Sequence, residues 1–333
     1  MVNSKISGVG IYVPENIVKN KDLESKMNTS DEWIQERTGI QERRWVDDKD
    51  LTTSYMGTIA SERAIDNAGI SKDEIDFIIF ATLSPDYFFP GSGVLLQRNL
   101  GIKEVGALDV RNQCSGFIYG LSIADQYIKS GMYKNILVVG SEVHSGALDK
   151  TSRGRAVSVI FGDGAGAVVL SADNSDKGIL STHLHSEGKH AEELAVLKPA
   201  TSFWIDEIIN DENEDGTSYL PYMNGNFVFK NAVLRFEEVI FEALQYSNLK
   251  PNDISLLIPH QANLRISQFI QKRLGLKDDQ VYNNIMKYGN TTAASIPIAL
   301  KEAINEKKIK SGDLICLAAF GSGFTWASAL IRW

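Results

Sequence analysis

The chain has little cysteine and no long apolar run. Only two of its 333 residues are cysteines, too few for a disulfide framework and typical of a reducing compartment. The N-terminus has no apolar signal core, and apolar runs such as 136–139 have the length of a strand, far short of the roughly 18 residues of a membrane span. We therefore expect a soluble, cytoplasmic protein without a membrane partner.

The chain also lacks an excess of positive charge. Its formal net charge is −8 at pH 7, and 43% hydrophobic with 23% charged residues is ordinary for a globular enzyme. Nucleic-acid binding requires a basic surface, so this class of partner is not expected. A group of basic side chains in the second half is either a solvated surface or a docking face for an acidic partner: Lys230, Arg235, Arg265, Lys272 and Arg273.

Metal-binding residues at ligand spacing are missing as well. His183 and His185 fall on one side of an expected strand, but neither has a Cys, His or acidic residue at ligand spacing. The glycine-rich segment Phe161–Gly166 leads into an apolar strand and opens no helix, so it does not predict a dinucleotide site. We expect neither a metal nor a resident cofactor.

What the chain does have is internal repetition. In the first half an expected helix at 54–68 runs into an apolar strand at 77–80, and in the second half a helix at 236–245 runs into a strand at 255–258. Each half continues with a second strand, a polar junction, a helix and a last apolar strand. This alternation predicts β-α-β units and mainly parallel sheets buried between helices.

The repetition predicts an α/β fold of two pseudo-equivalent halves, residues 1–172 and 173–333, related by internal duplication. Gly140 and Gly321 are the expected counterparts on the two last strands. The stretch from about 173 to 222 is predicted to have no twin in the first half, and within it the segment at about 185–222 is predicted to be a cap insertion. Equivalent strand ends would converge at the seam between the halves, where ligand sites of α/β folds lie.

Three polar residues occupy such junctions: Cys114 between a strand and a helix, His260 directly after a strand, and Asn290 before a helix. A helix N-terminus favours a thiolate, so we expect a lowered pKa for Cys114. A thiolate captures acyl groups, a neutral histidine takes a proton or hydrogen-bonds a carbonyl, and an amide stabilises an oxyanion or enolate. Each residue also has a structural interpretation, as a buried small hydrophobe, a core histidine or a helix cap. Cysteine hydrolases use the same residue types, so hydrolysis and carbon–carbon bond formation both stay open.

Several longer motifs occur in order along nearly the full chain: Ser30–Ile34, Arg37–Ile40, the segment around Cys114, Phe161–Ala165, Pro259–Arg265, Gly289–Thr291 and Phe320–Trp326. Together they resemble the β-ketoacyl-acyl-carrier-protein synthase III family, condensing enzymes of the thiolase superfamily. The resemblance implies a thiolase-like fold of two α-β-α-β-α layered halves. It also implies a homodimer that acts on acyl-CoA and malonyl-acyl carrier protein, without a metal.

By this resemblance Cys114 takes an acyl group from a coenzyme A thioester. His260 and Asn290 would then hydrogen-bond the malonyl thioester carbonyl as carbon dioxide leaves, which gives 3-oxoacyl-acyl carrier protein in the initiation of fatty acid synthesis. The backbone N–H groups of Cys114 and Ser322 match the oxyanion hole. Stabilising an enolate beside a departing carboxylate calls for neutral donors, because an Asp or Glu would repel it.

Other positions match family contacts to the two substrates and to a second subunit. Five of them match contacts to coenzyme A: Trp33, Arg37, Thr38, Arg153 and Asn263. Phe89 matches the residue that crosses the dimer interface to the acyl pocket. Lys230 and Arg265 match positions that face the acidic carrier protein.

The sequence departs from the family pattern at two places near the site, and its cap from about 198 to 222 is longer than in compact members. The residues before the nucleophile, commonly small and apolar, are here Arg111–Gln113, and the closing loop is Gly-Ser-Gly at 321–323 instead of three glycines. These departures keep open a specialised condensing enzyme of secondary-metabolite or lipid biosynthesis that uses a longer or β-functionalised acyl thioester. A non-catalytic scaffold that binds carrier protein is a third reading, disfavoured by retention of the three junction residues.

Overall fold

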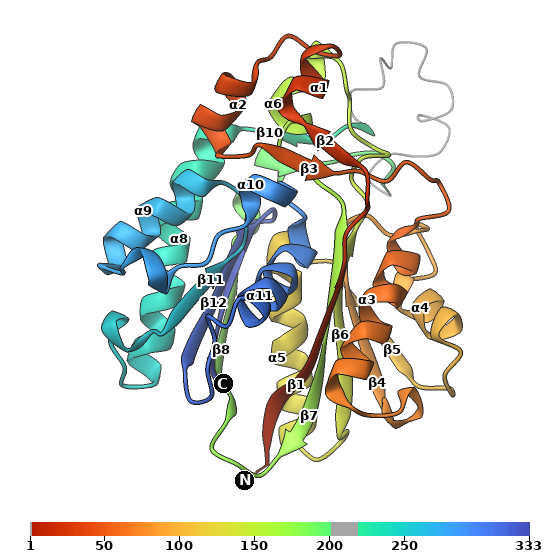
Figure 1. The fold of residues 1–333 in the computed structure, drawn as a ribbon, viewed down its shortest axis with the longest axis vertical. Coiled ribbons are helices and arrows are strands. Elements are labelled where there is room, and N and C mark those ends of the chain that lie inside the picture. Colours follow the sequence, from red (N-terminus) through yellow and green to blue (C-terminus); the bar gives the residue numbers. More distant parts are fainter. Residues whose placement is uncertain (1, 201–218) are drawn as a thin grey trace.

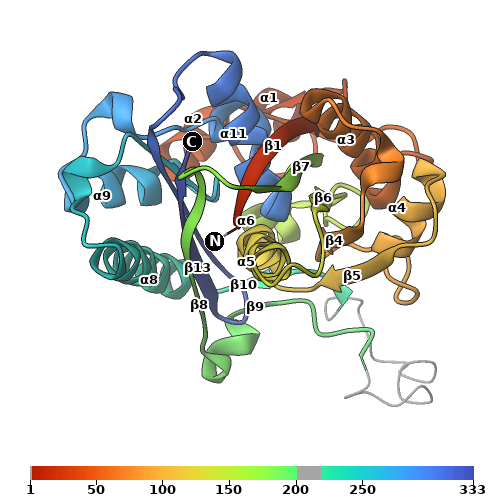
Figure 2. The same cartoon turned by 90° about the horizontal axis from the view of Figure 1, so that it is seen from below.

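The fold consists of two main sheets with helices between them and on both outer faces (Figure 1). The computed structural model describes residues 2–200 and 219–333 of the chain. Seen from below, helices and sheets alternate in five layers, with α5 and α11 in the central one (Figure 2). Among the described residues, no helix combines the length and the apolar character needed to cross a bilayer.

The first sheet has five strands. In spatial order they are β1 (Asn3–Tyr12), β7 (Gly164–Asp173), β6 (Asn135–Glu142), β4 (Phe77–Ala81) and β5 (Gly106–Val110). Two helices pack on its outer face and one on its inner face, namely α3 (Thr53–Ala68), α4 (Ser92–Leu100) and α5 (Gly116–Lys129). Because α5 lies between two sheets, it is apolar on most of its circumference.

The second sheet has four strands. In spatial order they are β8 (Gly178–Ser186), β13 (Thr325–Arg332), β12 (Leu314–Gly321) and β11 (Leu256–Pro259). The helices that pack on it are α8 (Gly225–Tyr246) and α9 (Leu264–Leu274) outside and α11 (Ser295–Asn305) inside. Every residue of β12 is buried, since both faces of this strand are covered by helices.

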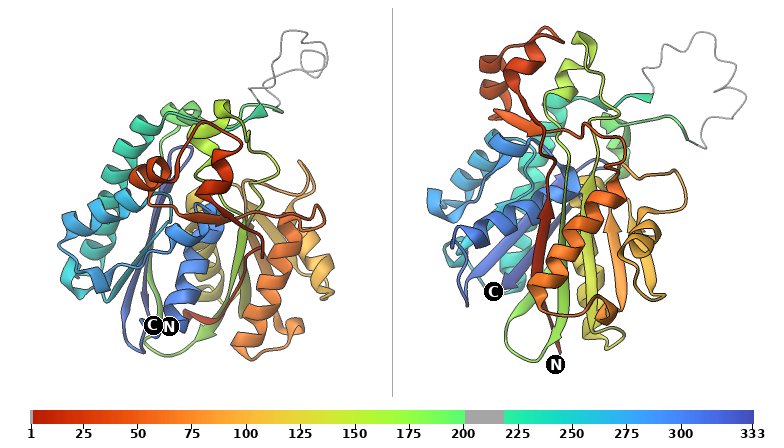
Figure 3. Two further views of the ribbon diagram at one scale, coloured as in Figure 1. Left: turned by 45° about the horizontal axis from the view of Figure 1, so that its top comes forward. Right: turned by 45° about the vertical axis from the view of Figure 1, so that its right-hand side comes forward.

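Short elements gather at the upper end of the molecule in Figure 1, and both chain termini lie at the opposite end (Figure 3). These elements are β2 (Ile17–Lys19), α1 (Asn20–Glu24), α2 (Asp31–Thr38), β3 (Glu42–Arg44), α6 (Arg155–Ser158), β9 (Leu194–Ala195), β10 (Tyr222–Met223) and α10 (Ile285–Tyr288). Of the predicted cap at 185–222, residues 201–218 lie outside the described part of the chain.

The two sheets repeat one register. Ile136 of β6 pairs with Phe77 and Leu170, and Ile315 of β12 pairs with Leu256 and Ile331, so these two residues occupy equivalent places. Both outer strands carry one extra residue at the matching position, Ser7 on β1 and Leu180 on β8. Such a shared irregularity is expected of duplicated halves. The prediction that 173–222 has no twin is therefore wrong for β8, which is the counterpart of β1.

This register corrects one predicted correspondence. Because Ile136 matches Ile315, the counterpart of Gly321 is Glu142 and that of Gly140 is Ala319. The glycines of the two last strands are therefore not equivalent, although each lies near a strand end.

The prediction of mainly parallel sheets is wrong, since both sheets are mixed. β4 runs parallel to β5 and β6, and β11 runs parallel to β12, whereas β1, β7, β8 and β13 pair antiparallel with their neighbours. The turn between β12 and β13 has only the residues 322–324. A connection of this length can join antiparallel strands only, because a parallel crossover needs about a dozen residues or more.

Candidate active site

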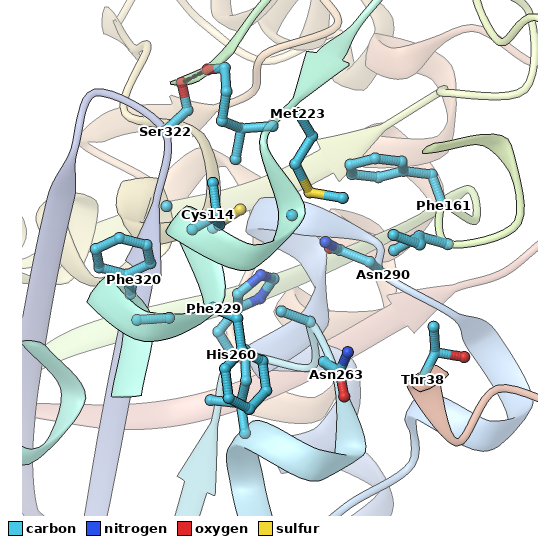
Figure 4. A pocket seen from close by; sticks show the side chains of 18 of the residues that line it. Thr38, Cys114, Phe161, Met223, Phe229, His260, Asn263, Asn290, Phe320 and Ser322 are labelled. Carbon is cyan, nitrogen blue, oxygen red and sulfur yellow. Dashed lines mark hydrogen bonds between the residues drawn. The ribbon is translucent and has the colours of Figure 1, made fainter. Parts of the chain in front are cut away.

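Cys114, His260 and Asn290 line one cavity of about 370 Å³, although they are far apart in the sequence (Figure 4). Cys114 lies in a 3-10 turn, Gln113–Ser115, at the start of α5. His260 directly follows β11, and Asn290 precedes α11. The seam between the two sheets therefore brings the predicted residues together.

Burial decides the protonation state of Cys114. It raises the pKa of this thiol to about 12, and the negative charge of Glu142 acts in the same direction. Hydrogen bonds from the backbone N–H groups of Cys114 and Ser322 lower the pKa by a smaller amount. The expectation of a lowered pKa is thus wrong for the resting protein, in which Cys114 is a neutral thiol, because desolvation outweighs the helix terminus.

The space next to Cys114 depends on the absence of a side chain at Gly321. A Cβ atom there would lie 2.7 Å from the Cβ atom and 3.2 Å from the Sγ atom of Cys114. Gly321 ends β12, so the close approach brings the following residue, Ser322, near Cys114. The hydroxyl of Ser322 donates to the Leu194 carbonyl, which ties the loop to β9.

His260 is a neutral side chain whose Nδ1 atom is hydrogen-bonded to the protein. Burial lowers its pKa to about 3. Its Nδ1 atom lies 2.7 Å from Ser295 Oγ, and its backbone N–H donates to the Ala318 carbonyl at 2.8 Å. Its Nε2 atom is buried and has no hydrogen-bond partner among the described residues. That nitrogen is therefore available to a substrate in the cavity.

Asn290 presents an amide donor to the same space. Its Oδ1 atom accepts the backbone N–H of Thr292 at 2.8 Å, so its Nδ2 group is the part left to donate. Its backbone N–H donates to Ile160 O, and its carbonyl accepts from Gly162. These bonds attach the residue to the segment around Phe161 in the first half of the chain.

The lining of the cavity includes four of the five predicted coenzyme A contacts: Trp33, Arg37, Thr38 and Asn263. Two guanidinium groups contact the Trp33 ring, with Arg37 at 4.7 Å and Arg155 at 4.6 Å from its centroid. Asn263 caps α9 through its Oδ1 atom and donates to the Arg37 carbonyl at 3.0 Å. An aromatic ring flanked by cations suits a ligand with a flat base and phosphates.

The fifth predicted contact, Arg153, forms an ion pair with Asp149 at 2.6 Å, and its side chain is 55% exposed. Its role in binding stays a prediction. No role for Arg155 was predicted from the sequence. Its position two residues after Arg153 is the sequence feature that could have indicated it.

A second cavity of about 380 Å³ adjoins the first. The residues that line both cavities are Leu83, Gln113, Phe161, Leu194 and Ser322. Polar side chains line the second cavity too, among them Arg111, His144 and Lys198. His144 is buried, its pKa is lowered by burial to about 3, and its Nε2 atom lies 2.8 Å from Thr292 Oγ1.

Phe88 lines this second cavity, while the predicted dimer residue Phe89 is 81% exposed. Tyr87 is exposed as well, so three aromatic residues in a row project from the surface. An exposed apolar group of this kind is typical of an interface. The dimer itself stays a prediction.

Glu142 is a buried carboxylate that the sequence reading missed. It accepts hydrogen bonds from the hydroxyls of Thr82 and Ser84 and from the backbone N–H groups of Leu83 and Ser84, at 2.6 to 3.2 Å. Burial raises its pKa to about 7, and these donors and the Ala293 backbone N–H lower it. Glu142 thereby holds the loop after β4 that lines both cavities.

Two members of the predicted basic group in the second half form ion pairs, which lowers the positive charge of that group. Arg235 pairs with Glu187 and Glu238, and Arg273 pairs with Glu237. Arg265 lines the cavity, and Lys230 lies on α8.

His183 and His185 both contact the carboxylate of Glu242. In the described part of the chain, no cluster of three or more His, Cys, Asp or Glu side chains is arranged to hold a metal ion.

Comparison with known families agrees with this geometry. A model of 3-oxoacyl-[acyl-carrier-protein] synthase III matches residues 108–188, and a model of the C-terminal part of the same enzyme matches residues 244–333. The β-ketoacyl-[acyl-carrier-protein] synthase III of Yersinia pestis is 46% identical over 329 residues, with 99% of each chain covered. That of Aquifex aeolicus is 45% identical over 332 residues, with 100% of each chain covered.

Solved structures give the same result. The Aquifex aeolicus enzyme superposes with a TM-score of 0.90 at 45% identity, covering 99% of this chain and 100% of that one. A priming β-ketosynthase of the R1128 polyketide pathway follows with a TM-score of 0.89 at 31% identity, covering 99% of this chain and 96% of that one. The predicted thiolase-like fold is confirmed, and this chain belongs to the β-ketoacyl-[acyl-carrier-protein] synthase III family.

Proposed function

We propose that the protein joins an acyl-CoA primer to malonyl-acyl carrier protein and releases carbon dioxide, as the condensing step that initiates fatty acid synthesis. The observation that carries this proposal is the convergence of Cys114, His260 and Asn290 on one cavity. The cavity supplies one nucleophile and two neutral hydrogen-bond donors, which is the set that acyl capture and enolate stabilisation require.

In the first step the Cys114 sulfur attacks the thioester carbon of acyl-CoA. The backbone N–H groups of Cys114 and Ser322 stabilise the negative oxygen of the tetrahedral intermediate. The carbon–sulfur bond to coenzyme A then breaks, and the thiol proton of Cys114 leaves with the coenzyme A thiol. The product is an acyl-cysteine in a buried site from which water is excluded.

In the second step malonyl-acyl carrier protein enters the same cavity. The bond to its carboxylate breaks, carbon dioxide leaves, and the electron pair forms an enolate whose oxygen accepts hydrogen bonds from His260 Nε2 and Asn290 Nδ2. The enolate carbon attacks the acyl-cysteine carbonyl, and the carbon–sulfur bond breaks to give 3-oxoacyl-acyl carrier protein and the Cys114 thiolate, which takes up a proton. A neutral His260 suits this role, because its pKa of about 3 keeps it uncharged at physiological pH.

The second cavity favours a further candidate, a primer longer than acetyl. It shares a wall with the Cys114 cavity through Gln113 and Ser322 and adds about 380 Å³. An acyl chain attached to Cys114 can extend into that space only if Gln113 leaves it open. This candidate differs from the first in the primer and keeps the chemistry.

For partners, we propose a homodimer formed through the exposed aromatic residues 87–89 and a carrier-protein surface that includes Lys230 and Arg265. Acyl-CoA would lie against Trp33 and its flanking arginines, with no metal or resident cofactor. We place the protein in the cytoplasm, because these substrates and an unmodified Cys114 thiol would occur together in that compartment.

Intact-protein mass spectrometry after incubation with acetyl-, butyryl-, octanoyl- and longer acyl-CoA tests the proposal. We expect an acyl adduct that is lost in Cys114→Ala and kept in Cys316→Ala, since Cys316 is the other buried free cysteine and serves as the matched control. An acetyl adduct supports the initiating role, and adducts with long chains only support the second candidate. No adduct, or an acyl group that is hydrolysed without malonyl thioester, contradicts the condensing function.

A further inference from the structure

The side of His260 that faces away from the cavity rests on a buried serine. Ser295, the first residue of α11, lies with its Oγ atom 2.7 Å from His260 Nδ1. The backbone N–H of Gln261 donates to the same oxygen at 3.4 Å. Ser295 and His260 are 2% and 3% exposed, so solvent does not satisfy either group.

Hydrogen-bond accounting selects one tautomer. A serine hydroxyl has one hydrogen to donate, and its oxygen accepts. If Nδ1 of His260 carried the proton, Ser295 would accept from both Nδ1 and Gln261, and its own O–H would need another acceptor. No other partner of Ser295 Oγ occurs among the described residues. If the Ser295 O–H donates to Nδ1, the hydroxyl and Nδ1 are both satisfied, and among the described residues only Nε2–H is left for a substrate in the cavity. The opposite tautomer would leave both Nε2 and the buried Ser295 O–H unpaired, which adds the cost of an unpaired donor.

The Gln261 backbone N–H that orients the serine is held firmly. The Gln261 side chain accepts the N–H groups of Asn284 and Ile285 at 2.9 and 3.2 Å. It donates to the carbonyls of Pro259 and Tyr282 at 2.7 and 3.3 Å. A side chain fixed at both ends keeps the peptide at Gln261 in place, and with it the direction of the Ser295 hydroxyl.

We propose that Ser295 is a positioning residue that donates its hydroxyl hydrogen to Nδ1 of His260, so that Nε2 carries the proton and points it into the cavity. The step that this tautomer serves, donation to the enolate oxygen, rests on the proposed condensing function. The tautomer itself does not depend on that function. In this state Nε2 cannot take the Cys114 proton, so Ser295 matters to the second step and not to acyl transfer.

The first test is the nitrogen-15 spectrum of the histidine rings in the wild-type protein, with His260 assigned by its loss in His260→Ala. The expected result is a protonated Nε2 and an unprotonated, hydrogen-bonded Nδ1 at neutral pH. A protonated Nδ1 overturns the proposal. This measurement needs no turnover and no variant of Ser295.

The second test separates the two steps in Ser295→Ala. Acylation of Cys114 by acyl-CoA should stay within about twofold of wild type, while carbon dioxide release from malonyl-acyl carrier protein should fall about tenfold, the loss typical of one orienting hydrogen bond. Ser328→Ala is the matched control, because Ser328 is a buried serine of the same half whose hydroxyl donates to Val239 O at 2.9 Å. Equal losses in both steps, or none in either, contradict the proposal. If the wild-type protein itself releases no carbon dioxide, the proposed function fails, and the ring spectrum still decides the role of Ser295.

Discussion

The two halves of the molecule build the same turn and use it differently. In both, a residue with positive φ begins a short 3-10 turn that leads into a central helix: Gln113 (φ 45°) before α5 and Thr292 (φ 48°) before α11. The next residue is Cys114 in the first half and Ala293 in the second. The duplicated backbone therefore offers two equivalent positions for a nucleophile, and only one carries a thiol.

The last strands explain why only one position is open. Gly321, at the end of β12, leaves room beside Cys114, so the N–H groups of Cys114 and Ser322 face the thiol. At the equivalent place on β6, the carboxylate of Glu142 takes the N–H of Ala293. One half thus has an open turn, and in the other half the side chain of Glu142 fills the equivalent space, so a single residue at a strand end separates the two.

The halves also differ at the sheet edge. The first sheet has the edge strand β5, whereas the corresponding segment of the second half contributes a single bridge, Leu257 with Val281. The junction before Asn290 is therefore connected more loosely to its own sheet and is attached to Ile160 and Gly162 of the other half. These hydrogen bonds to the other half bring Asn290 near Cys114.

The largest expected effect comes from moving the nucleophile. Cys114→Ala should reduce acyl transfer at least about a thousandfold, because no other group in the cavity forms the thioester. Adding Ala293→Cys should restore nothing, since Glu142 occupies the N–H group that would stabilise the oxyanion there. Mass spectrometry of acyl adducts measures both variants, and an adduct on residue 293 would show that the two turns are functionally equivalent.

Removing the donors of the second half should affect the second step only. His260→Ala and Asn290→Ala should each lower condensation by about a hundredfold or more, the loss typical of one oxyanion donor. The acyl-Cys114 adduct should still form in both, as measured in parallel by mass spectrometry and carbon dioxide release. Loss of the adduct would mean that the second half activates the nucleophile.

Adding one methyl group to each last strand separates catalysis from packing. Gly321→Ala places a Cβ atom 2.7 Å from that of Cys114, and Gly140→Ala places one 2.3 Å from the Ala293 carbonyl oxygen. Both should lower the free energy of unfolding by about 1–3 kcal/mol through overpacking. Among correctly folded molecules, only Gly321→Ala should lose acylation. Equal losses of activity in both variants would contradict the conclusion that the turn at Cys114 is open and the turn at Ala293 is filled.

Replacing the carboxylate that fills the second turn should change the pH dependence of stability. Burial raises the pKa of Glu142 from 4.5 to about 7, so its contribution is full below pH 4.5 and is lost as the pH rises through about 7. The rise corresponds to about 3 kcal/mol. Relative to wild type, Glu142→Gln should gain up to this amount between pH 4.5 and 8 in urea unfolding. A difference that does not change with pH would show that Glu142 has no raised pKa.

The smallest effects should come from two residues that line the cavity, Trp33 and Arg265. Trp33→Ala should raise the KM for acyl-CoA several-fold, since stacking on one ring contributes about 1 kcal/mol. Arg265→Ala should raise the KM for malonyl-acyl carrier protein by a similar factor and reduce its salt dependence. Steady-state kinetics with each substrate varied in turn measures both KM values. If Trp33→Ala raised the KM for malonyl-acyl carrier protein and Arg265→Ala that for acyl-CoA, the two residues would have the opposite roles.

Much of this molecule followed from its sequence. The repeated order of helices and strands predicted two halves, and their apolar strands lie where the pattern placed them, for example β4 and β11. Cys114, His260 and Asn290 could be selected because each follows or precedes a regular element at a junction. Such local patterns depend on residue periodicity, which the sequence displays directly.

The tertiary structure alone decided the rest. The mixed strand directions, the equivalence of Gly321 with Glu142, the neutral thiol of Cys114 and the Ser295–His260 pair all result from contacts between distant segments. The pKa of a side chain depends on how completely it is buried and on which donors and charges surround it, and neither follows from its sequence neighbours. The sequence determined which residues could react, and packing determined their protonation states and which of the two equivalent turns is open.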